Sequence, residues 1–173
     1  MFDKISVPEG AAIRDVATFL ASGAGVGLSR WAPGTMGSAL GVAVVWPIEE
    51  PSLILCWSAW ALATVTAIWA AQKAGKSWGV VDHPAIVIDE VVGVWLAILL
   101  PMSLLSVTTP SLHLLISCLL VFRVYDIVKP WPVNWSERRF KGGLGVVSDD
   151  LVAGAMAGFC VTAGYIVAKL LSI

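Results

Sequence analysis

Long apolar stretches separated by short polar segments dominate the chain. Four of them approach the roughly 20 mostly apolar residues that cross a bilayer as a helix, and they cover residues 52–72, 86–105, 111–128 and 151–171. A fifth stretch, 35–47, is shorter and rich in small residues. It is either a short span or a re-entrant segment, and we favour the span. Residues 16–28 are weakly apolar and glycine-rich, which indicates an interfacial helix. The pattern predicts an all-α protein, a polytopic helical membrane bundle of about five transmembrane segments.

Composition agrees with this class of protein. The chain has 173 residues, of which 58% are hydrophobic and 13% charged, whereas soluble domains have about 25% charged residues. The net charge of -1 argues against nucleic acid as a partner. The length predicts one integral membrane domain, residues 1–173. Within it we expect residues 1–34 to form a cytoplasmic or interfacial region with a glycine-rich loop, and 35–173 to form the helical bundle.

The basic residues indicate the orientation. If the five stretches cross the membrane in turn, with turns at 49–51 and 106–110, Lys169 alone lies on one side. The other ten lie together on the opposite side: Lys4, Arg14, Arg30, Lys73, Lys76, Arg123, Lys129, Arg138, Arg139 and Lys141. Because positive residues are enriched in cytoplasmic segments, this predicts a cytoplasmic N-terminus and an external C-terminus.

Six carboxylates lie at the ends of the apolar segments: Asp82, Asp89, Glu90, Asp126, Asp149 and Asp150. The same threading places all six on the cytoplasmic side. A charged side chain within hydrocarbon costs about 2.5–3.5 kcal/mol, so these groups require cations. Mg²⁺ usually takes one or two carboxylates together with waters and phosphate oxygens. The sequence therefore predicts a site for a metal ion and an anionic ligand at this face.

Simpler explanations exist for some of these acids. Asp149 and Asp150 would suit the N-cap and first turn of a helix, where the dipole favours an anion. Asp126 lies at a helix C-terminal end, where the dipole disfavours it, but an ion pair with Arg123 or Lys129 is an equal alternative. For Asp126, the ion pair and a role in the metal site are compatible.

The segment 25–38, GVGLSRWAPGTMGS, offers a second element of a site. Its backbone N–H groups could cradle a phosphate at the start of a helix, with hydroxyls from Thr35 and Ser38 and a charge from Arg30. By spacing alone we favour a different interpretation, an N-cap loop that leads into a small-residue packing face.

The segment 129–145 and His83 complete the candidate chemistry. Trp131 and Trp135 with flanking bases are typical of an interfacial anchor, in which Lys129 could also guide an anionic lipid headgroup. His83 could transfer a proton at neutral pH, but a hydrogen-bonded interfacial histidine is the favoured interpretation.

Four strings together resemble the bacterial phosphatidylglycerophosphatase A family: PGTMGS (33–38), DHPAIVIDEVVGVW (82–95), FRVYDIVKPWPVNW (122–135) and GGLGVVSDDLVAG (142–154). The resemblance covers residues 25–154, without departure at the acidic positions. It implies a Mg²⁺-dependent, multi-pass enzyme of the bacterial cytoplasmic (inner) membrane with its active site facing the cytoplasm. The implied reaction converts phosphatidylglycerophosphate into phosphatidylglycerol and inorganic phosphate, with membrane lipids as the surroundings and an oligomer possible.

We assign the site residues accordingly. Metal ligands are expected among Asp82, Asp89, Glu90 and Asp149. Catalytic carboxylates are expected among Asp89, Glu90, Asp126, Asp149 and Asp150. Substrate binding is expected from Arg30, Thr35, Ser38 and Lys129. The attacking group is a water or a carboxylate, and the absence of an aspartyl-phosphatase signature favours water.

Two other functions fit a membrane chain with acids. A cation or solute transporter predicts carboxylates near mid-membrane and an inverted repeat, and neither is found in the sequence. A non-catalytic scaffold would use its acids only to pair with neighbouring bases.

Overall fold

The computed structural model describes residues 11–48 and 52–171, and within them every regular element is helical. The order is α1 (Val16–Ala21), a short 3₁₀ helix η1 (Val26–Leu28), α2 (Pro33–Val45), α3 (Leu53–Trp78), α4 (Ile88–Leu104), α5 (Leu112–Val128), α6 (Val133–Arg139) and α7 (Gly142–Leu171). The all-α prediction is confirmed. The predicted turn at 49–51 and the predicted position of Lys4 lie outside the described residues.

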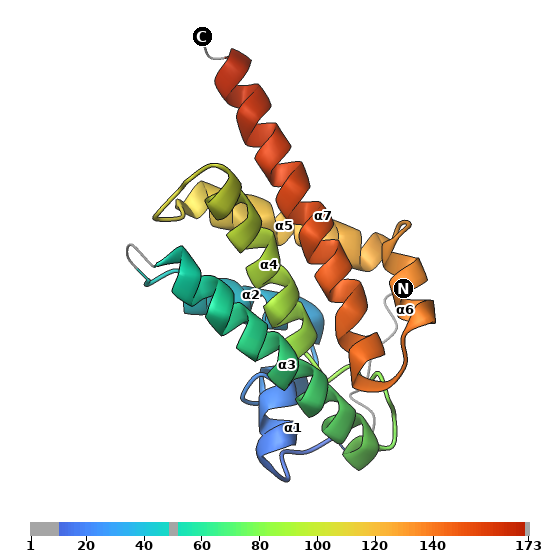
Figure 1. The fold of residues 1–173 in the computed structure, drawn as a ribbon. Helices are drawn as coiled ribbons and strands as arrows, with labels where there is room; N and C mark the ends of the chain where they lie inside the picture. The colour runs from blue at the N-terminus through green and yellow to red at the C-terminus, as the bar shows by residue number, and fades with distance from the viewer. Residues whose placement is uncertain (1–10, 49–51, 172–173) are drawn as a thin grey trace.

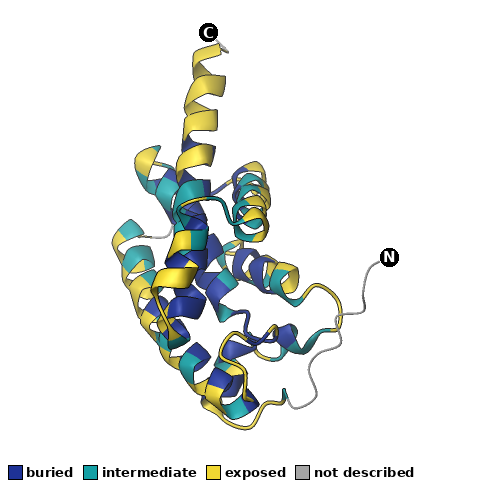
Figure 2. Cartoon of the chain, turned by 90° about the vertical axis from the view of Figure 1, so that its right-hand side faces the viewer, coloured by how far each residue is buried: buried dark blue, intermediate teal, exposed yellow. Residues whose placement is uncertain are grey.

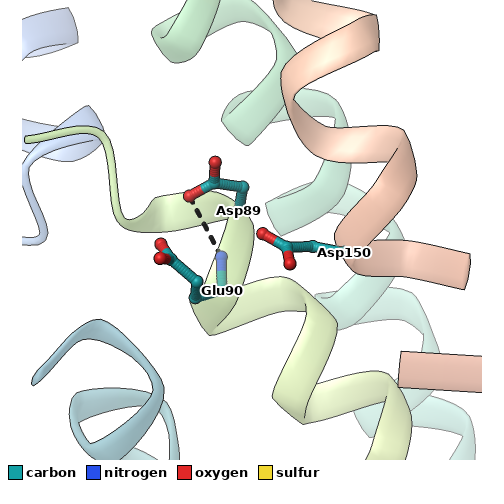
Figure 3. A group of neighbouring side chains, drawn as sticks. All are labelled: Asp89, Glu90 and Asp150. Carbon is teal, nitrogen blue, oxygen red and sulfur yellow. Dashed lines mark hydrogen bonds between the residues drawn. The ribbon is translucent and has the colours of Figure 1, made fainter. Parts of the chain in front are cut away.

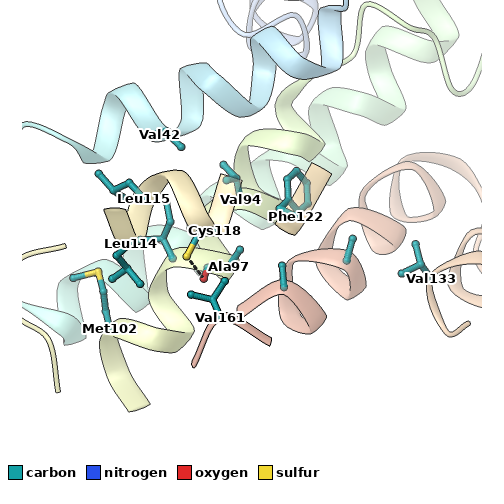
Figure 4. Close-up of a cluster of buried hydrophobic side chains, with 13 residues drawn as sticks. Val42, Val94, Ala97, Met102, Leu114, Leu115, Cys118, Phe122, Val133 and Val161 are labelled. Carbon is teal, nitrogen blue, oxygen red and sulfur yellow. Dashed lines mark hydrogen bonds between the residues drawn. The ribbon is translucent and has the colours of Figure 1, made fainter. Parts of the chain in front are cut away.

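Helix α4 lies at the centre of the bundle and packs against α2, α3, α5 and α7 (Figure 1). One hydrophobic core lies where α4, α5 and α7 meet, around Ile98, Cys118 and Phe122 (Figure 4). A second core joins α3 to α4 and α7 through small side chains such as Ala67 and Ala71. The short alanine side chains let α3 approach its neighbours closely.

Two helices, α3 and α7, are long and apolar enough to cross a membrane. The α2 helix is apolar but shorter. The outer half of α7 extends beyond the other helices and is exposed (Figure 2), with Leu170 and Leu171 at 66% and 82% exposure. Apolar surface of this kind suits contact with lipid. The count of about five spans and the orientation stay predictions.

The start of α7 differs from the sequence prediction. The helix begins at Gly142 and not near residue 151, because Gly143 packs against α3 and its N–H donates to Gln72 Oε1 at 2.8 Å. Asp149 and Asp150 therefore lie about two turns inside the helix and are buried. The proposal that they occupy the N-cap and first turn is wrong, so the helix dipole does not explain them.

Glycines bring the helices that carry the acids close together. A side-chain carbon added at Gly154 of α7 would lie 3.0 Å from the carbonyl carbon of Gly93 in α4, and nearer still to its oxygen. Likewise, a carbon at Gly37 of α2 would lie 2.6 Å from Cβ of Val87. The packing interpretation of the glycines in segment 25–38 is thus supported. α7 contacts α4 backbone to backbone, and α2 packs closely against Val87 at the start of α4.

The close contact between Gly93 and Gly154 should contribute to the free energy of unfolding. Gly154→Ala should destabilise the protein by about 1–3 kcal/mol, because the added methyl group forces α4 and α7 apart. Gly164→Ala is the matched control, since a carbon at Gly164 meets no atom of residues 11–48 and 52–171 within 4 Å. Thermal unfolding in detergent would measure both variants, and equal midpoints for the two would contradict the packing described here.

Candidate functional site

The structure contains a polar pocket of about 420 Å³. It lies where the first turns of α2 and α4 meet the last turn of α5 and residues 146–150 of α7. All six carboxylates selected from the sequence line it: Asp82, Asp89, Glu90, Asp126, Asp149 and Asp150. The lining therefore comes from five segments that are separate in the sequence: the start of α2, the loop before α4, α4 itself, the end of α5 and α7.

Three of these acids form a tight group, as Figure 3 shows. Asp89 and Glu90 come from the first turn of α4, and Asp150 reaches them from α7. One carboxylate oxygen from each lies within 4.8 Å of the others. Asp89 Oδ1 accepts a hydrogen bond from the Glu90 backbone N–H at 3.0 Å, which fixes one carboxylate of the group.

The group has few internal partners. Asp89 and Asp150 are 6% and 4% exposed, and in the described residues neither forms a salt bridge. Glu90 Oε2 and Asp150 Oδ1 are buried with no hydrogen-bond partner in the same part of the chain. Buried carboxylate oxygens without partners are costly, and they are the donors that hard divalent cations prefer. The group therefore fits a divalent metal ion.

Two basic side chains lie among the acids. The guanidinium of Arg123 pairs with Asp126 one turn away on α5, lies 3.8 Å from Glu90 Oε1, and donates to Ser38 Oγ at 3.4 Å. The ion-pair alternative for Asp126 is thus confirmed, although Asp126 also lines the pocket. Arg123 and Lys129 are the two Lys or Arg residues among the described lining residues, so the six carboxylates outnumber the cationic groups.

Lys129 lies just beyond α5 and lines the pocket beside Asp149. Its Nζ donates to Asp149 Oδ2 at 2.7 Å and lies 3.2 Å from Glu137 Oε1. Burial lowers the pKa of Lys129, but the hydrogen bonds and negative charges of Asp149 and Glu137 outweigh this and raise the pKa above its ordinary value. Lys129 therefore stays protonated at neutral pH, with Asp149 as its fixed partner.

The loop before α4 contributes Asp82 and His83. Burial raises the pKa of Asp82, although the positive charge of Lys129 opposes that shift. His83 is buried, accepts a hydrogen bond from the Ala85 N–H at Nδ1, and packs against Trp78. Burial also lowers the pKa of His83, so the ring is neutral at neutral pH. This agrees with the hydrogen-bonded histidine favoured from the sequence.

The N-terminus of α2 closes the pocket on one side. Ala32, Pro33, Gly34 and Thr35 line it, and within the described part of the chain no side chain caps the helix. A side-chain carbon at Gly34 would collide with Glu90 Oε1 and lie 3.2 Å from an Arg123 nitrogen. Glycine thus lets the ends of the Glu90 and Arg123 side chains lie against the first turn of α2, where the free N–H groups and the positive dipole end of the helix are.

The residues predicted to bind substrate do not all reach the pocket. Thr35 and Lys129 line the pocket, whereas Arg30 is exposed and is not part of the lining. Ser38 is buried behind the pocket and donates its hydroxyl hydrogen to the Gly34 carbonyl at 2.8 Å. Asp149, predicted as a metal ligand, faces Lys129 and is not one of the three grouped acids.

Arg123 was considered from the sequence only as an ion-pair partner. The signal that could have selected it is a guanidinium within an otherwise apolar helix, one turn before an aspartate. A half-buried arginine that contacts two carboxylates and a hydroxyl also suits a phosphate group.

Known proteins with similar sequences indicate the family of this chain. Residues 19–165 match the sequence profile of the family Phosphatidylglycerophosphatase A. The chain is 34% identical over 142 residues to phosphatidylglycerophosphatase A of Escherichia coli (strain K12), covering 80% of this chain and 77% of the relative. It is 31% identical over 141 residues to phosphatidylglycerophosphatase A of Haemophilus influenzae, covering 80% and 82%.

A third relative has a different name. The chain is 38% identical over 141 residues to a putative phosphatidylinositol-3-phosphatase of Bacteroides thetaiotaomicron, covering 78% of this chain and 84% of the relative. No solved structure matches the chain. The family match and the relatives confirm the resemblance seen in the sequence motifs: the chain belongs to the phosphatidylglycerophosphatase A family, a family of phosphatases.

Proposed function

We propose that the chain hydrolyses phosphatidylglycerophosphate to phosphatidylglycerol and inorganic phosphate, with Mg²⁺, at the cytoplasmic face of the bacterial inner membrane. The observation that carries this proposal is the group of Asp89, Glu90 and Asp150 in a pocket that also holds Arg123 and Lys129, in a chain of this family. The relatives' names supply the substrate, and the pocket supplies groups suited to a phosphate monoester.

The metal would be held by Asp89, Glu90 and Asp150, whose oxygens already lie within 4.8 Å of one another. Asp82 and Asp149 line the same pocket and could hold a second ion or orient water. When bound, Mg²⁺ would offset the negative charge of the phosphate oxygens and of the carboxylates. Without such a cation, a pocket lined by six carboxylates would repel a phosphate.

The chain's own groups would position the phosphate. Arg123 supplies a planar guanidinium within the pocket, and Ser38 and Asp126 hold it in place. The first N–H groups of α2 and the hydroxyl of Thr35 offer donors on the same side. Lys129, fixed by Asp149, adds a second positive charge. Arg30 does not line the pocket, so it would contribute only by attracting the anionic lipid before the phosphate binds.

A carboxylate beside the phosphate can accept the proton of the attacking water. Asp149 suits this role because Lys129 holds its Oδ2, while its Oδ1 is buried and has no partner among the described residues. Asp126, paired with Arg123, is the second candidate. Both lie in the pocket that the metal-binding group shares.

The transporter alternative is not favoured. Its carboxylates should lie along a path through the bundle, whereas the acids here gather at one end of α4 and α5, and the family is one of phosphatases. The exposed Trp131 and Trp135 near that end suit the headgroup layer, which supports a pocket that a lipid phosphate can reach.

Metal dependence is the first test. Purified protein in detergent should release inorganic phosphate from phosphatidylglycerophosphate with Mg²⁺, stop after EDTA, and resume when Mg²⁺ is restored, because the acids need a cation to admit the phosphate. Phosphate release measured by a colorimetric assay would check this. Unchanged release in EDTA would contradict the metal proposal, and no release from any lipid phosphate would contradict the function.

Substitution of the grouped acids is the second test. Asp89→Asn and Asp150→Asn should each lower kcat by at least roughly a hundredfold, since even groups that only support a metal ligand are worth 10–100-fold. Asp15→Asn is the matched control. Asp15 caps α1 outside the pocket, and asparagine is an equally good N-cap residue. Near-normal kcat for Asp150→Asn in folded protein would remove Asp150 from the proposed site.

A further inference from the structure

A second cavity, of about 120 Å³, lies between α2 and α3 with α4 as its floor. We call it the apolar groove. Val44 lines it from the end of α2 and Ile48 from the segment that follows, Ala59 and Trp60 from α3, and Ile98 and Met102 from α4. Ile98 and Met102 are each 1% exposed, whereas Val44 and Ile48 are 46% and 43% exposed. The groove therefore has a buried floor and an open mouth on the side of the bundle.

Two tryptophans line the apolar groove, and the indole N–H of each donates a hydrogen bond to a backbone carbonyl. Trp60 Nε1 donates to the Val92 carbonyl at 3.0 Å, and Trp95 Nε1 donates to the Gly41 carbonyl at 2.8 Å. The surface left facing the groove is apolar, made of aliphatic, aromatic and sulfur-bearing side chains. Water finds no hydrogen-bond partners in such a cavity, so its natural occupant is an apolar group.

The groove is connected to the acidic pocket by two helices that run side by side. α2 and α4 both begin at the acidic pocket, at Gly34 and Glu90, and both reach the groove further along. Val44 lies ten residues after Gly34 and Ile98 eight after Glu90. At 1.5 Å per helical residue, the groove lies about 12–15 Å along the helices from the acids. A phospholipid has this arrangement, with a charged headgroup followed by hydrocarbon.

We propose that the apolar groove holds part of an acyl chain of the lipid whose phosphate enters the acidic pocket. This inference rests on the proposed function and adds to it a subsite for the hydrocarbon of the substrate. The open mouth at Val44 and Ile48 lets the chain enter sideways from the bilayer. Helices α2 and α4 then fix the distance between the reacting phosphate and the bound hydrocarbon.

Filling the groove tests the proposal. Ala59→Trp places a large ring at the groove, while Ala61→Trp is the matched control on the opposite side of α3, because Ala61 is also exposed and does not line the groove. KM and kcat would be measured for phosphatidylglycerophosphate with long acyl chains and with six-carbon chains. Ala59→Trp should raise KM for the long-chain substrate about tenfold, equivalent to about 1.4 kcal/mol, and change the short-chain KM much less. Ala61→Trp should resemble the wild type with both substrates.

Crosslinking gives a second measurement that does not depend on a variant. Phosphatidylglycerol with a diazirine in one acyl chain would be photolysed with the wild-type protein, and the labelled peptides identified by mass spectrometry. Label concentrated at residues 44–48 and 56–60 supports the proposal. Label scattered over the exposed faces of α3, α5 and α7 overturns it. A second copy of the chain seated in the groove would exclude the lipid and leave these residues unlabelled, which also overturns it.

The two proposals fail in different ways. If wild-type protein hydrolyses no lipid phosphate, the proposed function fails whatever the crosslinking shows. If wild-type protein is active, and Ala59→Trp keeps the wild-type ratio of long-chain to short-chain KM, the acyl-chain subsite fails and the phosphatase activity stands.

Discussion

The repulsion among the buried carboxylates of Asp89, Glu90 and Asp150 is the constraint on which the rest of the structure depends. Like charges a few ångströms apart in a medium of low dielectric strongly disfavour one another. The fold nevertheless brings them together, because Gly93 and Gly154 let α4 and α7 approach backbone to backbone. Such an arrangement is stable when a cation offsets the charges. The contact between Gly93 and Gly154 therefore determines how close the three acids lie to one another.

The same central helix connects the chemistry to the membrane. α4 carries two of the acids in its first turn and forms the floor of the apolar groove further along. α2 accompanies it, with Gly34 at the acids and Val44 at the groove. Small residues on α2 keep the two helices in close contact. Headgroup and hydrocarbon binding would thus be set by one rigid helix pair, which suits an enzyme whose substrate lies in a bilayer.

Hydropathy and charge predicted much of this fold. The helical class, the approximate positions of α2 to α5 and the gathering of six acids at one face all followed from the sequence, because apolar length and charge position are local properties. The pairing of the acids did not. Asp149 and Asp150 are neighbours in sequence, yet they point about 100° apart on a helix. Only the packing of α7 decides that one faces Lys129 and the other faces Asp89.

The thermal midpoint of unfolding, measured without substrate, shows whether Asp89, Glu90 and Asp150 bind a divalent cation. In wild-type protein in detergent, adding Mg²⁺ after exhaustive chelation should raise the midpoint, because a ligand that binds the folded state stabilises it. In Asp150→Asn the chelated protein should be more stable than the chelated wild type, since one repelling charge is gone, and Mg²⁺ should add little. Equal midpoints with and without Mg²⁺ in the wild type, together with no gain in the chelated variant, would contradict the account.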